Sequence, residues 1–169
     1  MRPLTGVIGL AVVTLVLLAS NQAGAQQMSN LYGAPIGVET ARKVAQAAIA
    51  EGKKNGWMVA AAVVDPGGAL VYFERIDGTQ SGSTEVAQHK ARSAAAFKRP
   101  TKAFEEAVAG GRTAVLGLPG AVPLEGGIPL VVDGKIVGAI GVSGATSQQD
   151  GVCAKAGADV LGPATPAQK

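Results

Sequence analysis

The stretch from Ile128 to Val142 constrains the fold more than any other part of the chain, because it predicts a tight β-hairpin. Two apolar runs, residues 128–132 and 135–142, are separated only by Asp133-Gly134. A two-residue Asp-Gly loop between apolar runs is typical of a type I′ turn, in which both residues have positive φ. Strands joined so tightly must be antiparallel, so the sequence predicts an antiparallel sheet.

A second hairpin is predicted earlier in the chain. Trp57 to Val64 is apolar throughout and too short for another helix, which favours a strand covered on both faces. The sequence Asp-Pro-Gly-Gly at 65–68 favours a reverse turn, because proline fixes φ and glycine accepts positive φ. Residues 69–75 then return as the second strand of this hairpin.

Three segments are predicted to be helices: one precedes the hairpin at 57–75, and two lie between that hairpin and the one at 128–142. Apolar residues from Val38 to Gly52 recur at spacings of three and four, which places them on one helical face. Residues 84–98 are rich in alanine, and the helix is expected to end at Arg99-Pro100 because the residue before a proline avoids the α conformation. A short helix follows from Thr101 and stops before the glycines at 110 and 111.

Capping signals predict a last helix. Thr146-x-x-Gln149 and Ser147-x-x-Asp150 are overlapping capping-box patterns. The apolar side of this helix is expected to consist of Val152, Cys153, Ala156 and Val160. The order of elements predicts an α/β (α+β) fold, in which helices pack on a central antiparallel sheet.

Length and composition favour one domain and exclude several classes of protein. The chain has 169 residues, of which 47% are hydrophobic, and this argues against disorder. Its net charge is +3 and no run of Lys or Arg exceeds two residues, so no nucleic-acid partner is expected. Cys153 is the single cysteine, which excludes an intrachain disulfide and a zinc ribbon.

Residues 1–25 have the plan of a secretory signal peptide. Arg2 precedes the apolar run 7–19, and the small residues Ala23-Gly24-Ala25 follow. A helix over this run would rise about 20 Å, short of the roughly 30 Å hydrocarbon core, although an uncleaved anchor is the alternative. We expect a periplasmic or secreted protein without stable membrane insertion. Its predicted parts are a flexible N-terminus at 26–35, one domain at 36–162 and a tail at 163–169.

Three blocks of sequence resemble the HbpS/GlcG-like heme-binding family, which also occurs as the C-terminal module of some PduO-type proteins. The blocks are residues 59–75 with Asp77-Gly78, residues 89–101, and residues 126–150, in matching order over about residues 36–161. The resemblance implies an α/β sandwich with a five-stranded antiparallel sheet and assembly into homo-oligomers, often octamers. It also implies heme binding for secreted members and iron sensing or heme degradation for some.

His89, the single histidine, is the first candidate for an axial heme ligand. On a helix, Glu85, His89 and Ser93 follow at intervals of four, so the carboxylate would orient the imidazole. Arg92 and Arg99, with Lys90 on an adjacent stripe, would meet the heme propionates by charge-assisted hydrogen bonds. A surface helix with a lone exposed histidine is the alternative.

The resemblance suggests a second ligand. In one heme-binding member a threonine hydroxyl is implied as the ligand, and Ser93 stands at that place in the pattern Lys90-Ala91-Arg92-Ser93-Ala94. A neutral hydroxyl binds iron weakly, which would suit transient scavenging. Three other candidates are weaker: Met58 and Tyr72 are expected to be structural strand residues, and Cys153 an inert buried thiol.

Two other functions remain open. The motifs of zinc proteases, α/β-hydrolases and P-loop proteins are absent, so a catalytic role has no motif behind it. The glycine- and proline-rich stretch 110–127 would nonetheless shape a pocket for a small organic substrate, with Glu125 and Arg112 as its polar groups. Alternatively, the chain is a structural oligomer whose interface uses these glycines and alanines.

Overall fold

The hairpin predicted around Asp133-Gly134 is present in the computed structural model, which describes residues 31–162. Strand β3 (Gly127–Val132) pairs antiparallel with β4 (Lys135–Ser143). Asp133 has φ 49° and Gly134 has φ 71°, as a type I′ turn requires. The second predicted hairpin is also confirmed, with β1 (Ala60–Val64) antiparallel to β2 (Leu70–Arg75).

The sheet has four strands in the order β2-β1-β4-β3, so the expectation of five is wrong for residues 31–162. The segment before the first helix makes only one bridge, between Tyr32 and Ile136. There the amide of Gly33 donates to the carbonyl of Ile136 at 2.8 Å, and the amide of Ile136 donates to the carbonyl of Leu31 at 2.9 Å. Among the described residues, this segment forms no strand, but residues 31–33 of the predicted flexible N-terminus are held against β4 by these bonds.

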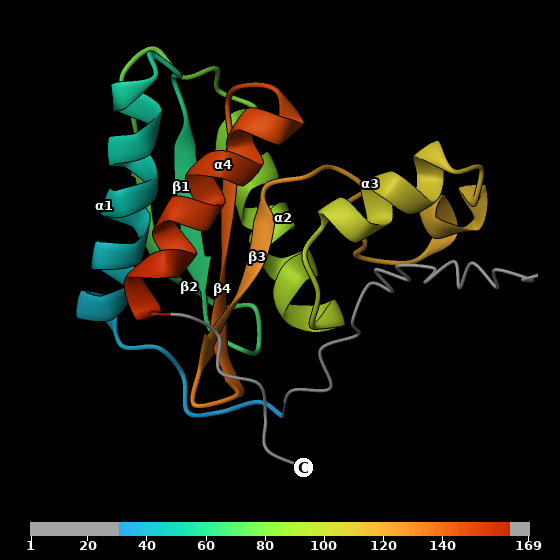
Figure 1. Cartoon of the computed structure of the whole chain (residues 1–169), viewed down its shortest axis with the longest axis horizontal. Helices are drawn as coiled ribbons and strands as arrows, with labels where there is room; N and C mark the ends of the chain where they lie inside the picture. Colours follow the sequence, from blue (N-terminus) through green and yellow to red (C-terminus); the bar gives the residue numbers. More distant parts are fainter. Residues whose placement is uncertain (1–30, 163–169) are drawn as a thin grey trace, which may run out of the picture.

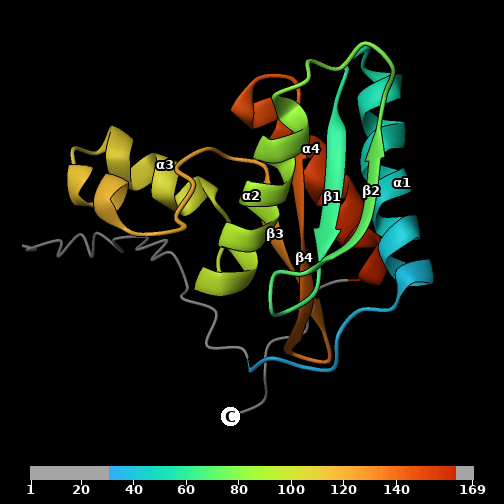
Figure 2. The same cartoon turned by 180° about the vertical axis from the view of Figure 1, so that it is seen from behind.

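Helices cover both faces of the sheet, as predicted (Figures 1 and 2). Helices α1 (Val38–Lys54) and α4 (Ser147–Ala158) pack together on one face, and α2 (Ser83–Phe97) covers the other. Helix α3 (Lys102–Ala109) and the 3₁₀ turn η1 (Thr113–Gly117) project to one side. We call residues 102–124 the arm. A short 3₁₀ turn, η2 (Asp159–Leu161), follows α4.

The two faces of the sheet are packed differently. Towards α1 and α4, β1 and β4 present large aliphatic side chains, including Val63, Ile140 and Val142. Towards α2 the contacts are made almost entirely by small residues: Ala60, Ala62, Ala87, Ala91, Ala94, Ala95 and Ala139. Small side chains let two backbones approach closely, so α2 lies tight against the sheet.

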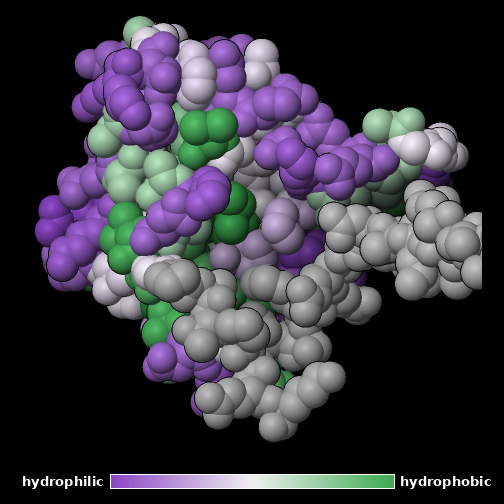
Figure 3. All heavy atoms as spheres, viewed as in Figure 1, coloured by the Kyte–Doolittle hydropathy of each residue, from purple (hydrophilic) through white to green (hydrophobic). Residues whose placement is uncertain are grey.

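The predicted start of α4 is confirmed. Of its predicted apolar side, Cys153 is buried, whereas Val152 and Val160 are not. Thr146 is the N-cap, and its hydroxyl and the Gln149 side chain form a complete capping box. The buried residues of the helix are Asp150, Gly151, Cys153, Ala154 and Gly157. Val152 and Val160 are 49% and 45% exposed, and Figure 3 shows hydrophobic residues reaching the surface of this face.

The predicted signal peptide and the tail at 163–169 lie outside the described residues. Within residues 31–162, no helix is long and apolar enough to cross a membrane.

Candidate functional site

The exposed side of α2 carries two of the predicted site residues next to each other. The alanines of α2 face the sheet, so Glu85, His89, Arg92 and Ala96 form the opposite, exposed stripe. The His89 Nε2 lies 3.8 Å from Glu85 Oε2, and the side chains are 60% and 73% exposed. This distance is too long for a hydrogen bond. Because the imidazole is mostly exposed and not held by Glu85, it is accessible to a ligand.

Arg92 continues this stripe and borders a hollow. Its Nε donates to the carbonyl of Gly68 at 3.2 Å, and its Nη2 donates to Gln88 Oε1 at 3.1 Å. The hollow of about 320 Å³ is lined by Arg92 and Ala96 and by the β1–β2 turn residues Pro66, Gly67 and Gly68. A guanidinium group at the edge of an open hollow is suited to bind a carboxylate.

Ser93 does not share this open surface with His89. Only 1% of the residue is exposed, and its Oγ accepts a hydrogen bond from the amide of Val122 at 3.1 Å. The end of the arm, at Val122, therefore covers the hydroxyl. In a single chain, Ser93 is not accessible to a metal or a porphyrin.

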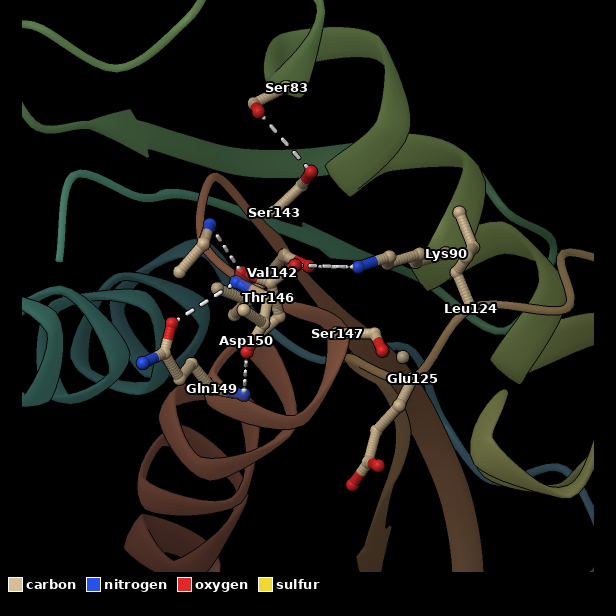
Figure 4. Close-up of polar contacts among 12 residues, drawn as sticks. Ser83, Lys90, Leu124, Glu125, Val142, Ser143, Thr146, Ser147, Gln149 and Asp150 are labelled. Atoms are coloured by element: carbon tan, nitrogen blue, oxygen red, sulfur yellow. Dashed lines mark hydrogen bonds and ion pairs between the residues drawn. The ribbon is translucent and has the colours of Figure 1, made fainter. Parts of the chain in front are cut away.

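Lys90 is buried, and this corrects our expectation that it meets a propionate at the surface. Its Nζ lies 2.8 Å from Asp150 Oδ2 and donates to the carbonyl of Val142 at 3.1 Å (Figure 4). The two side chains are only 2% and 3% exposed. Because the ammonium group is buried and bound by Asp150 and Val142, it does not reach the exposed surface of α2.

Asp150 is the partner that the sequence analysis missed. Its Oδ1 accepts a hydrogen bond from the amide of Ala145 at 3.0 Å, so both carboxylate oxygens are bound. Burial raises the pKa of Asp150, and Lys90 and the backbone amides partly offset this effect. The position of Asp150 in the first turn of α4 had been interpreted only as a capping signal.

The base of the arm is fixed by a second group of polar contacts. The Thr101 hydroxyl donates to the carbonyl of Leu124 at 2.6 Å and accepts from the amide of Gly127 at 2.9 Å. Glu105 accepts from the amide of Glu125 and, at 2.8 Å, from the Ser147 hydroxyl of α4. These contacts tie both ends of the arm to the sheet and to α4.

The structure does not bring Glu125 and Arg112 together as a shared substrate pocket. Glu125 pairs with Lys102 at 3.2 Å, at the base of the arm. Arg112 instead lines a hollow beneath the arm, together with Arg99. Arg99 therefore lies in a different hollow from Arg92, and the two hollows share no lining residue.

The remaining candidate ligands have structural roles or positions. Cys153 is fully buried, and this burial raises the pKa of its thiol to about 11, as expected for an inert thiol. The Tyr72 hydroxyl donates to Glu74 Oε2 at 3.2 Å. Met58 is 48% exposed, so the prediction that it is a core residue is wrong.

Within residues 31–162, no three His, Cys, Asp or Glu side chains are grouped so that they could hold a metal ion.

Comparison with known proteins gives consistent matches. Residues 36–159 match the family described as "Haem degrading protein HbpS-like". The protein GlcG of Escherichia coli strain K12 is 48% identical over 93 residues, which cover 55% of this chain and 69% of GlcG.

Two solved structures have the same fold. A double mutant of Streptomyces reticuli HbpS is 30% identical, with a TM-score of 0.71 over 95% of this chain and 100% of that chain. The structure of a PduOC:heme complex is 24% identical, with a TM-score of 0.69 over 79% of this chain and 99% of that chain.

Proposed function

The chain belongs to the HbpS-like family, and we propose that it is an exported protein that binds heme for scavenging or sensing of heme or iron. The observation that carries this proposal is the open stripe of α2. It offers an accessible imidazole, His89, one turn from a guanidinium, Arg92, at the edge of a hollow. A relative of the same fold was solved as a heme complex, which supports the choice of ligand.

The residues present fit heme in part. Bound heme would supply an iron centre that can take an imidazole nitrogen as a ligand. His89 would provide that nitrogen, with Glu85 close enough to orient the ring through a small rotation or a water molecule. Arg92 would bind a propionate. Lys90 is excluded by its burial, and Ser93 would become available only if Val122 moved away.

One chain offers only one wall for a ligand as large as heme. His89 is 60% exposed, and a porphyrin bound there would keep most of its apolar surface in water. Burying both sides of such a ligand requires a second surface. We therefore propose that heme binds between copies in a homo-oligomer, for which an octamer is the assembly implied by the resemblance.

Titration with hemin tests the ligand. We expect micromolar protein to shift the Soret band of hemin, and we expect His89→Ala to move this band and weaken binding by about tenfold or more, because no second histidine can replace the ligand. Lys43→Ala is the control, because Lys43 lies exposed on α1 on the opposite side of the sheet. An unchanged Soret band with the wild-type protein would contradict heme binding. An unchanged band with His89→Ala alone would contradict the proposed ligand.

Export has its own test. Expressed with its native N-terminus in a Gram-negative host, the protein is expected in the periplasmic fraction, with a mass and N-terminal sequence that correspond to cleavage after Ala25. The control is the variant Ala23→Leu/Ala25→Leu, which removes the small residues that the signal peptidase requires. A full-length protein that stays in the cytoplasm would contradict export and leave heme binding untouched.

A further inference from the structure

The hollow beneath the arm has an aromatic floor. The Phe97 and Phe104 rings meet edge to face, with centroids 5.2 Å apart at an interplanar angle of 78°. The remaining apolar lining comes from the arm: Ala103, Ala107, Val115 and Leu118. This surface would favour the apolar body of a ligand, because aromatic side chains dominate the energy of small-molecule sites.

Two guanidinium groups complete the lining of this hollow. Arg99 lies over the Phe104 ring, 5.6 Å from its centroid, and its Nε donates to the carbonyl of Phe97 at 3.2 Å. Arg112 follows Gly111, whose φ of 91° turns the chain back after α3. Both arginines therefore stand at the same apolar hollow.

Neither guanidinium is neutralised by the part of the chain that the structure describes. Arg99 and Arg112 form no ion pair with any residue between 31 and 162. The Glu105 carboxylate on α3 is bound to Glu125 and Ser147 at the base of the arm. The hollow thus combines an apolar floor with two free positive charges, which complement an apolar anion.

We propose that this hollow is a second binding site, separate from the heme face, for a small organic anion with an aromatic or branched apolar body and one carboxylate. Its volume of about 260 Å³ equals that of roughly nine water molecules, so it accommodates about nine non-hydrogen atoms and cannot enclose a porphyrin. The apolar body packs on Phe97 and Phe104, and the carboxylate binds Arg99 and Arg112. The site is independent of the proposed heme function, because it shares no lining residue with the hollow beside Arg92.

Benzoate has the required size and chemistry and serves as the probe. Titrated into the purified full chain and followed by backbone amide NMR shifts, it is expected to bind with a dissociation constant of about 0.1–1 mM. The largest shifts should occur at Phe97, Arg99 and Arg112. Arg112→Gln should weaken binding by about tenfold, because it removes one charged hydrogen-bond donor. Arg112 is exposed, so the variant is expected to fold.

Three controls make the result specific. Arg75→Gln removes an exposed arginine on β2 and should leave benzoate binding unchanged. Benzyl alcohol, which keeps the ring without the charge, and acetate, which keeps the charge without the ring, should each bind at least about tenfold more weakly.

The proposal would be overturned if benzoate caused no saturable shifts or if it bound equally well to Arg112→Gln. It would also be overturned if benzoate bound only after dilution to monomer, because a second copy of the chain would then fill the hollow in the assembly. Hemin titration of the same samples separates this failure from a failure of the proposed function.

Discussion

Lys90→Met is expected to lower the free energy of unfolding by about 3–5 kcal/mol. The substitution keeps a side chain of similar length but leaves the Asp150 carboxylate 3% exposed and without its cation. An unpaired charge in this position cannot be hydrated as it is in the unfolded chain. Urea unfolding, with the slope m held constant between variants, measures the loss.

The loss of stability in Lys90→Met should also depend on pH, and the raised pKa of Asp150 determines the direction of this dependence. Without Lys90, burial raises this pKa further above its ordinary value of 3.8, so the folded state binds the proton more tightly than the unfolded state does. Stability is then greatest at low pH and is lost as pH rises through the folded-state pKa. The difference between wild type and Lys90→Met should therefore grow as the pH rises above the ordinary carboxyl pKa of 3.8.

Two further variants separate the buried charge from a general effect of losing a lysine. Lys155→Met removes an ion pair with Asp159 whose side chains are 70% and 62% exposed, and it should cost less than about 1 kcal/mol. Lys90→Met/Asp150→Asn removes both charges but keeps an oxygen for the Ala145 amide, so it should be at least about 1 kcal/mol more stable than Lys90→Met. If Lys90→Met lost little unfolding free energy and this loss did not depend on pH, the Lys90–Asp150 pair would not stabilise the fold.

The elements of this fold are predictable because their signals are local. The two hairpins follow from turn residues at 65–68 and 133–134, and the start of α4 follows from the capping box of Thr146. The apolar side of α4 was not predictable in the same way. Val152 and Val160 are as apolar as Cys153, and only the position of α1 and the sheet decides which of them is covered.

The sequence predicted only those features of the candidate site that depend on spacing along one helix. Glu85 and His89 share one exposed stripe, as helical spacing predicts, but the stripe continues to Arg92 and not to the buried Ser93. Lys90 and Ser93 lie on the same helix, but their surroundings come from residues far along the chain, Asp150 and Val122. Lysine is rarely buried, so no local signal pointed to the pair. The glycines at 126 and 127 were an indirect signal, because a Cβ on Gly126 would lie 3.0 Å from the Lys90 Nζ.

Gly141→Ala is expected to cost at least about 3 kcal/mol of unfolding free energy, because β4 touches the backbone of α2 at this residue. A Cβ here would lie 2.5 Å from the Ala91 amide nitrogen and closer still to the carbonyl oxygen of Ala87. Backbone atoms inside a helix cannot rotate away as a side chain can, so the whole helix would have to move.

Gly117→Ala is the matched control, since no atom lies within 4 Å of the added Cβ and the residue sits in the arm. It should change stability by less than about 1 kcal/mol, or raise it slightly by reducing the entropy of the unfolded chain. Because α2 carries His89 and Arg92, any folded fraction of Gly141→Ala should also bind hemin more weakly than wild type, while Gly117→Ala should not. Equal urea midpoints for the two variants would mean that α2 can move off the sheet at little cost, and its exposed stripe would then not be a rigid platform for a ligand.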